Sequence, residues 1–125
     1  MGNFRTLTVW QRAHELTLAM YRATARFPET ERLGLVSQMR RAAVSIAANI
    51  AESRGRMSHR DRCRLLYFAL GSAREIECLV LIAHGLQMLN DADHDVFIVS
   101  INEIQRMLVG LLRADQRSLE VDHRA

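Results

Sequence analysis

Residues 36–52 read VSQMRRAAVSIAANIAE, and this stretch decides the fold. Its apolar positions recur at alternating steps of three and four residues, which is the spacing of one face of an α-helix. These positions are Val36, Met39, Ala43, Ile46 and Ile50. We therefore predict a helix over about residues 31–53, closed at Gly55 because glycine commonly follows the last helical turn.

Three further segments repeat this spacing and predict helices over residues 7–26, 58–88 and 93–114. Pro28 ends the first of them, because proline cannot continue a helix and pushes the preceding residue out of the helical conformation. Ser58 is placed to cap the start of the next one. The segment 58–88 is the longest of the four, so we expect part of it to protrude or to contact another subunit.

The composition favours the same all-α class. Of the 125 residues, 49% are hydrophobic and 25% are charged, and Gly and Pro together number only seven. So few turn-forming residues argue against a many-stranded β fold. Short connections between helices make neighbours antiparallel. We predict one domain, residues 1–125, folded as an up-down-up-down antiparallel four-helix bundle with a frayed polar tail at residues 115–125.

Membrane-spanning and secretory patterns are not found in the sequence. The longest uncharged stretches, residues 78–90 and 42–51, are shorter than the roughly 18 to 20 residues that a spanning helix needs. The first residues also lack the apolar core of a signal peptide. We expect a cytoplasmic protein without a membrane partner.

A polar stripe runs beside the apolar face of the helix at 31–53. Its members on that helix are Gln38, Arg41, Ser45, Asn49 and Glu52. Small alanines flank the stripe and predict close approach of other helices, so Ser72 and Glu75 on the following helix are candidate partners. We interpret the seven residues as a structural or inter-subunit hydrogen-bond network; a solvated face and a ligand site are the alternatives.

Arginine supplies all 17 basic side chains, and they are unevenly distributed. Residues 1–74 hold 13 arginines against 5 acidic residues, whereas residues 75–125 hold 4 against 9. Five arginines cluster within eleven residues: Arg54, Arg56, Arg60, Arg62 and Arg64. Because guanidinium groups bind phosphates, this cluster is a candidate nucleic-acid contact. The alternative is a solvated helix end in which the arginines have capping roles.

The helix at 58–88 carries a second apolar stripe beside its core-facing one. The residues of this second stripe that we predict to form a subunit interface are Leu65, Phe68, Leu79, Ile82 and Leu86. A single four-helix bundle covers one broad face of each helix, and an apolar patch left over usually marks an interface. The pattern therefore predicts a homo-oligomer. The opposite net charges of the two halves favour a head-to-tail contact that closes into a ring.

No motif for catalysis, metal binding or a cofactor stands out in the sequence. The acidic run Asp91, Asp93 and Asp95 resembles the start of a calcium loop, but Val96 occupies the position where such a loop needs glycine. We interpret these acidic residues as caps of the last helix. We predict no enzyme activity, no metal and no cofactor.

Several short motifs together resemble a known family. They are LTVWQ at 7–11, FP at 27–28, QMRRAAVSI at 38–46, NIAE at 49–52, and Gly71-Ser72 with Glu75. Their order and spacing, over about residues 4–113, resemble the four-helix-bundle family of proteins encoded in intervening sequences of bacterial 23S ribosomal RNA. The chain departs from the family pattern at Ala47 and Ser53, where Pro and Gly are common.

The resemblance implies a cytosolic bacterial bundle that assembles as a ring-like homopentamer. Relatives include the accessory protein of diversity-generating retroelements, which partners a reverse transcriptase and nucleic acid. We therefore expect a non-enzymatic oligomeric adaptor associated with structured RNA or with a nucleic-acid enzyme. A small-molecule binder or enzyme that uses the polar stripe, and a purely structural assembly without nucleic acid, are the two alternatives.

Overall fold

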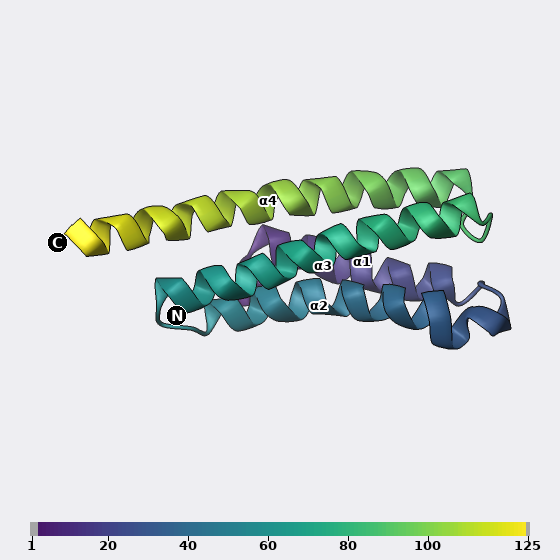
Figure 1. The fold of residues 1–125 in the computed structure, drawn as a ribbon, viewed down its shortest axis with the longest axis horizontal. Coiled ribbons are helices and arrows are strands. Elements are labelled where there is room, and N and C mark those ends of the chain that lie inside the picture. The colour runs from purple at the N-terminus through teal and green to yellow at the C-terminus, as the bar shows by residue number, and fades with distance from the viewer. Residues whose placement is uncertain (1–2, 125) are drawn as a thin grey trace.

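Four long helices run alternately up and down along one axis (Figure 1). They are α1 (Thr8–Thr24), α2 (Ser37–Arg54), α3 (His59–Gly85) and α4 (Asp91–Arg124). The computed structural model describes the backbone of residues 3–124 and the side chains of residues 3–118. Each helix packs on the next one in sequence, and α4 also packs on α1. The predicted all-α class and antiparallel four-helix bundle are confirmed.

The core consists of the stripes that the sequence spacing marks. All five apolar positions predicted on the second helix are buried, and Met39, Ile46 and Ile50 are fully enclosed. The other helices supply Met20 from α1 and Ile76 from α3, together with the apolar stripe of α4. Removal of these side chains from water is the main force that holds the four helices together.

The entry to α2 differs from the prediction of a helix that starts at about residue 31. A 3₁₀ turn at Glu29–Glu31 and a π-helical turn at Arg32–Val36 precede the regular helix. The backbone leaves the helical conformation at Gly34 (φ −100°, ψ −110°), and the side chain of Glu31 accepts a hydrogen bond from the Leu35 amide at 3.3 Å. The chain therefore turns through a capped kink before α2 begins.

The third helix ends earlier than predicted, at Gly85 rather than near residue 88. Gln87 adopts a positive φ of 62°, and the amide of Met88 donates to the carbonyl of Ala83 at 2.9 Å. This closure of the last turn by a left-handed residue stops the helix.

The fourth helix is longer than predicted. It continues to Arg124, so the segment from residue 115 that we expected to fray begins as helix, and α4 with 34 residues exceeds α3 with 27. Its C-terminal end, yellow in Figure 1, extends beyond the other helices. The protruding element is therefore α4 and not α3. Over the described residues, no helix has the length and apolar character needed to span a membrane.

Candidate functional site

Two of the five clustered arginines face inward and bind one carboxylate. An Nη of Arg54, at the end of α2, lies 3.1 Å from an oxygen of Asp115 on α4. The Nε of Arg62, in the second turn of α3, lies 3.2 Å from the other oxygen. Asp115 is 8% exposed. This cluster, which we call the Asp115 cluster, joins α2, α3 and α4 at one end of the bundle.

The rest of the Arg62 guanidinium holds the connection between α2 and α3. One Nη donates to the backbone carbonyls of Arg56 and Met57 at 2.7 and 3.1 Å, and the other contacts the ring of His59. His59 also lies 3.4 Å from Asp115. Arg62 thus uses its donors within the subunit, as a structural side chain does.

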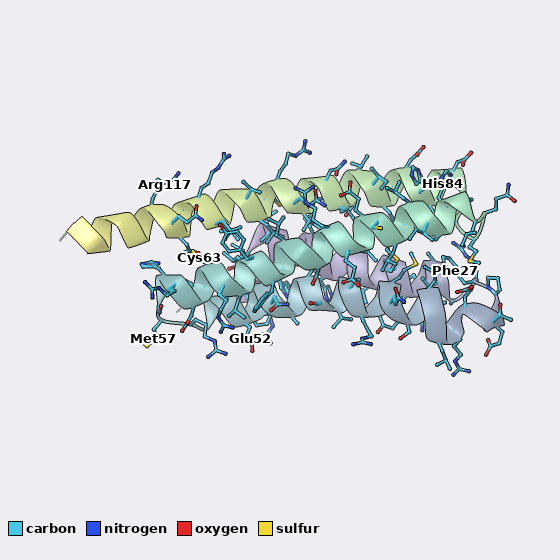
Figure 2. All side chains as sticks on the ribbon, viewed as in Figure 1. Phe27, Glu52, Met57, Cys63, His84 and Arg117 are labelled. Carbon is cyan, nitrogen blue, oxygen red and sulfur yellow. The ribbon has the colours of Figure 1, made fainter. Side chains whose placement is uncertain are left out.

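Cys63 is buried beside the Asp115 cluster, between α3 and α4 (Figure 2). Burial raises the pKa of the Cys63 thiol, and the negative charge of Asp115 raises it further, while Arg62 and Arg54 act in the opposite direction. A thiol with a raised pKa is a weak nucleophile at neutral pH.

The other three clustered arginines point toward solvent. Arg56 pairs with Glu52 at 3.6 Å across one exposed helical turn. Arg60 and Arg64 are exposed one turn apart on α3, and neither has a carboxylate partner among the described side chains. The guanidinium of Arg64 lies 5.7 Å from the centroid of the Phe68 ring. Within the predicted cluster, Arg60 and Arg64 are the two side chains that remain available to a phosphate.

Part of the predicted polar stripe lines an open groove of about 380 Å³ between α2 and α3. Its lining residues are Gln38, Arg41, Ala42, Ser45, Ser72 and Glu75. The Ser72 hydroxyl donates to the Ser45 hydroxyl at 2.8 Å, and the Asn49 amide donates to the carbonyl and hydroxyl of Ser45 at 2.8 and 3.0 Å. Five of the seven predicted residues therefore come together here.

The polar stripe is not sealed inside one subunit. Arg41 and Glu75 are both exposed, and no ion pair joins them within the described part of the chain. Asn49 and Glu52 do not line the groove: Asn49 bonds within α2, and Glu52 faces Arg56. An open groove with one cation and one anion on its rim can receive a ligand or the surface of another subunit.

The five residues predicted as an oligomer interface divide into two groups. Leu65 and Leu79 are buried inside the subunit at 4% and 6% exposure, so the prediction is wrong for these two. The reason is that α3 packs against both α2 and α4 and buries a wider face than one stripe. Phe68, Ile82 and Leu86 are 44% to 57% exposed.

Two further side chains, Tyr67 and Leu81, extend the exposed part of α3, each at 52% exposure. We call the exposed residues of the predicted interface the α3 ridge; they are Phe68, Ile82 and Leu86. Each addition lies one position before a predicted residue, which is about 100° around the helix, and seven positions from Arg74, so Tyr67 and Leu81 share the side of α3 that carries Arg74. The sequence shows that the outer face of α3 carries apolar residues. It does not show how far around the helix the buried face extends.

A second groove, which the sequence did not reveal, lies between α3 and α4 and measures about 600 Å³. Three arginines line it: Arg74 on α3, and Arg106 and Arg113 on α4. The steps from Arg106 to Gly110 and on to Arg113 follow one helical face, and that is the signal visible in the sequence. The sequence alone does not show that Arg74 meets this face, because the contact joins residues more than 30 positions apart.

No group of three or more potential metal ligands occurs among the side chains that the structure describes. His84 and His94 stack with ring centroids 4.1 Å apart at the connection of α3 and α4. Each of them bonds an acidic side chain of the α4 start: His84 to Asp91 at 2.7 Å and His94 to Asp95 at 2.9 Å. These contacts give the acidic run a structural role at the helix start.

The chain is similar to one family and to solved structures of the same fold. A crystal structure of a protein of unknown function from the S23 ribosomal protein family of Bacteroides thetaiotaomicron superimposes with a TM-score of 0.76. The alignment has 21% sequence identity and covers 83% of this chain and 97% of that one. At this identity the likeness shows a shared fold. No curated protein matches the chain.

A model of the family described as 23S rRNA-intervening sequence protein matches residues 5–110. The match includes the first three helices, both grooves except Arg113, and the α3 ridge. It stops before Asp115, the carboxylate that ties α4 to Arg54 and Arg62. Because the match covers most of the 125 residues of this chain, the chain belongs to the 23S rRNA-intervening sequence protein family.

Proposed function

We propose that this chain is a non-enzymatic adaptor that assembles with copies of itself and associates with structured RNA, directly or through a nucleic-acid enzyme. The observation that carries the RNA part is the exposed pair Arg60 and Arg64, one turn apart on α3 and without carboxylate partners among the described side chains. A guanidinium group suits bidentate hydrogen bonding to a phosphate. Arg54 and Arg62 support the fold instead, because both are paired with the largely buried carboxylate of Asp115.

Salt-dependent binding to a structured RNA hairpin, followed by fluorescence anisotropy, tests the RNA part. We expect binding at about 50 mM salt that weakens steeply toward 200 mM, because phosphate contacts release counterions. The double variant Arg60→Glu and Arg64→Glu weakens binding. A control variant with Arg22→Glu and Arg32→Glu changes net charge equally at exposed positions near the opposite end of the bundle and binds as the unmodified chain does.

Two results contradict this part of the proposal. Absence of binding by the unmodified chain at low salt removes direct association with RNA. Equal weakening by the control variant shows that net charge alone, and not the Arg60 and Arg64 surface, determines binding.

The assembly part is supported by the α3 ridge. Phe68 and, about four turns further along the chain, Ile82 and Leu86 expose apolar side chains, and exposed apolar surface of this kind often marks an interface. The resemblance described above gives five subunits in a closed ring. Light scattering tests this number: a ring has about five times the subunit mass of 14.3 kDa, whereas 14.3 kDa at every concentration overturns the assembly.

A paired substitution assigns the assembly to the α3 ridge. Ile82→Glu together with Leu86→Glu places charges on the ridge and lowers the mass. Leu33→Glu is the matched control, because Leu33 is 92% exposed but lies between α1 and α2, away from the ridge. Loss of assembly in the control, or an unchanged mass in the double variant, contradicts the assignment.

A small-molecule site between α2 and α3 is the second candidate function. The observation that favours it is the open polar groove with Arg41 and Glu75 on its rim. Its volume of about 380 Å³ falls in the range of known ligand pockets. A charge reversal at Arg41 distinguishes a subunit contact from a small-molecule site. If another subunit covers the groove, Arg41→Glu lowers the assembled mass. If the groove binds a small molecule, the assembled mass stays unchanged. Restoration of the mass by adding Glu75→Arg confirms an inter-subunit contact.

A further inference from the structure

We infer that the groove between α3 and α4 binds the phosphate backbone of RNA through Arg74, Arg106 and Arg113; this rests on the RNA association proposed above and names a second surface for it. The groove is formed by two helices of one subunit and measures about 600 Å³. Asn102, Gln105, Val109 and Gly110 complete its lining.

The three guanidinium groups have no counterion among residues 3–118, whose side chains the structure describes. No ion pair joins Arg74, Arg106 or Arg113 to a carboxylate among the described side chains. This differs from Arg54 and Arg62, which share the carboxylate of Asp115. Three like charges around one groove repel one another, and a polyanion that enters the groove relieves this repulsion.

Of the acidic side chains closest in sequence to the groove arginines, Glu75 lines the other groove, between α2 and α3, and Asp115 pairs with Arg54 and Arg62. The carboxylate of Glu77 accepts a hydrogen bond from the Gln105 amide at 3.0 Å. Glu103 pairs with Arg12 of α1 at 3.5 Å, at the junction of α1 and α4. Gln105 lines the groove, so the Glu77 carboxylate lies at its edge, and three arginines against this one carboxylate leave the groove with a net positive charge.

The shape of the groove suits an extended chain of phosphates better than one small anion. Arg106 and Arg113 are seven residues apart on α4, which is about 10 Å along the helix axis and spans more than one phosphate of a nucleic-acid strand. Gly110 lies between them without a side chain, and a Cβ atom placed there meets no atom within 4 Å. The space between the two arginines is therefore open to a ligand.

Further polar groups lie beyond the groove along α4. Arg117 follows Arg113 by one helical turn and projects from the outer side of α4 (Figure 2). Gln116 donates to the Tyr67 hydroxyl at 2.8 Å and so links α4 to α3 beyond the groove. Gln105, which is buried, also donates to the backbone carbonyl of Ala73 at 3.4 Å and holds the two helices in register under the arginines.

The test compares the groove variant Arg74→Gln, Arg106→Gln and Arg113→Gln with the unmodified chain in RNA binding from 50 to 300 mM salt. Each phosphate contact contributes roughly 0.7 to 0.9 to the slope of log affinity against log salt. We expect the groove variant to lower this slope by about 2 to 3 and to weaken binding at low salt more than tenfold. The matched control Arg5→Gln, Arg22→Gln and Arg32→Gln removes three exposed charges elsewhere and leaves the slope within about 1 of the original value.

Thermal unfolding and light scattering on each variant verify that the fold and the assembled mass are unchanged. If the unmodified chain binds RNA and the groove variant keeps its affinity and slope, the inference is overturned while the proposed function stands. If the unmodified chain binds no RNA at low salt, direct association with RNA and this inference both fall, while the assembly part of the proposed function stands. A slope that falls equally in the control also overturns the inference, since binding then follows net charge.

Discussion

The carboxylate of Asp115 on α4 lies 3.1 Å from the guanidinium group of Arg54 at the end of α2, 61 positions away in the sequence. Arg62 on α3 approaches the other carboxylate oxygen. One acidic side chain therefore pairs with two arginines of the basic segment, which leaves one net positive charge, and fixes α4 to the connection between α2 and α3.

We predict that Asp115→Asn lowers the free energy of unfolding by about 2 to 3 kcal/mol, because it leaves two largely buried guanidinium groups without a counterion. Urea denaturation followed by circular dichroism measures this change. Glu103→Gln is the control, since the Glu103 and Arg12 side chains are 31% and 46% exposed and such pairs contribute less than about 1 kcal/mol. Similar losses in both variants contradict a structural role specific to Asp115.

The helices and most of the core were predictable because both depend on local spacing. Met39 and Ile46 are buried as their period of three and four residues requires. The Asp115 cluster and the arginine groove were not predictable, because each depends on which faces of distant helices meet. Leu65 and Leu79 show the same limit: their apolar character is evident from the sequence, but their burial follows from how α3 packs between α2 and α4.

The two cysteines differ in environment, and we predict different reactivity. Cys63 is buried and its thiol pKa is raised, whereas Cys78 is exposed on α3. In a Cys78→Ser variant, the remaining Cys63 should react with a disulfide reagent at pH 8 about 100-fold more slowly in the folded protein than in urea, because labelling requires local opening. Equally fast labelling in both conditions contradicts burial of Cys63.

The turn after α3 offers a stabilising substitution. Gln87 is the one non-glycine residue with a positive φ, 62°, in the part of the backbone that the structure describes. Glycine adopts this conformation without steric cost, so we predict that Gln87→Gly raises the free energy of unfolding by about 0.5 to 1 kcal/mol. Gln87→Ala keeps the Cβ atom and should give no such gain. Equal stability of the two variants in urea denaturation contradicts the explanation.

The connection between α3 and α4 predicts a pH effect at Asp91. The hydrogen bond from His84, at 2.7 Å, is the main cause that lowers the pKa of the Asp91 carboxyl. The charges of His84 and His94 lower this pKa further, and slight desolvation of the carboxyl acts in the opposite direction. A carboxyl whose pKa is lower in the folded state than in the unfolded state stabilises the fold fully above its unfolded pKa. This contribution is fully present near neutrality and is lost as the pH falls through the lowered folded value, so stability changes with pH through Asp91 only in acid.

We predict that His84→Phe raises the pKa of Asp91 toward its ordinary value, measured by NMR titration of the carboxyl carbon. Phenylalanine keeps a ring that can stack on His94, which lies 4.1 Å away, but it removes the hydrogen-bond donor and the charge. The control is His14→Phe, because His14 stacks on Trp10 near the start of α1 and makes no hydrogen bond or ion pair with Asp91 among the described side chains. An Asp91 pKa that does not move in the His84 variant, or that moves equally in the control, contradicts the assignment of the shift to the His84 hydrogen bond.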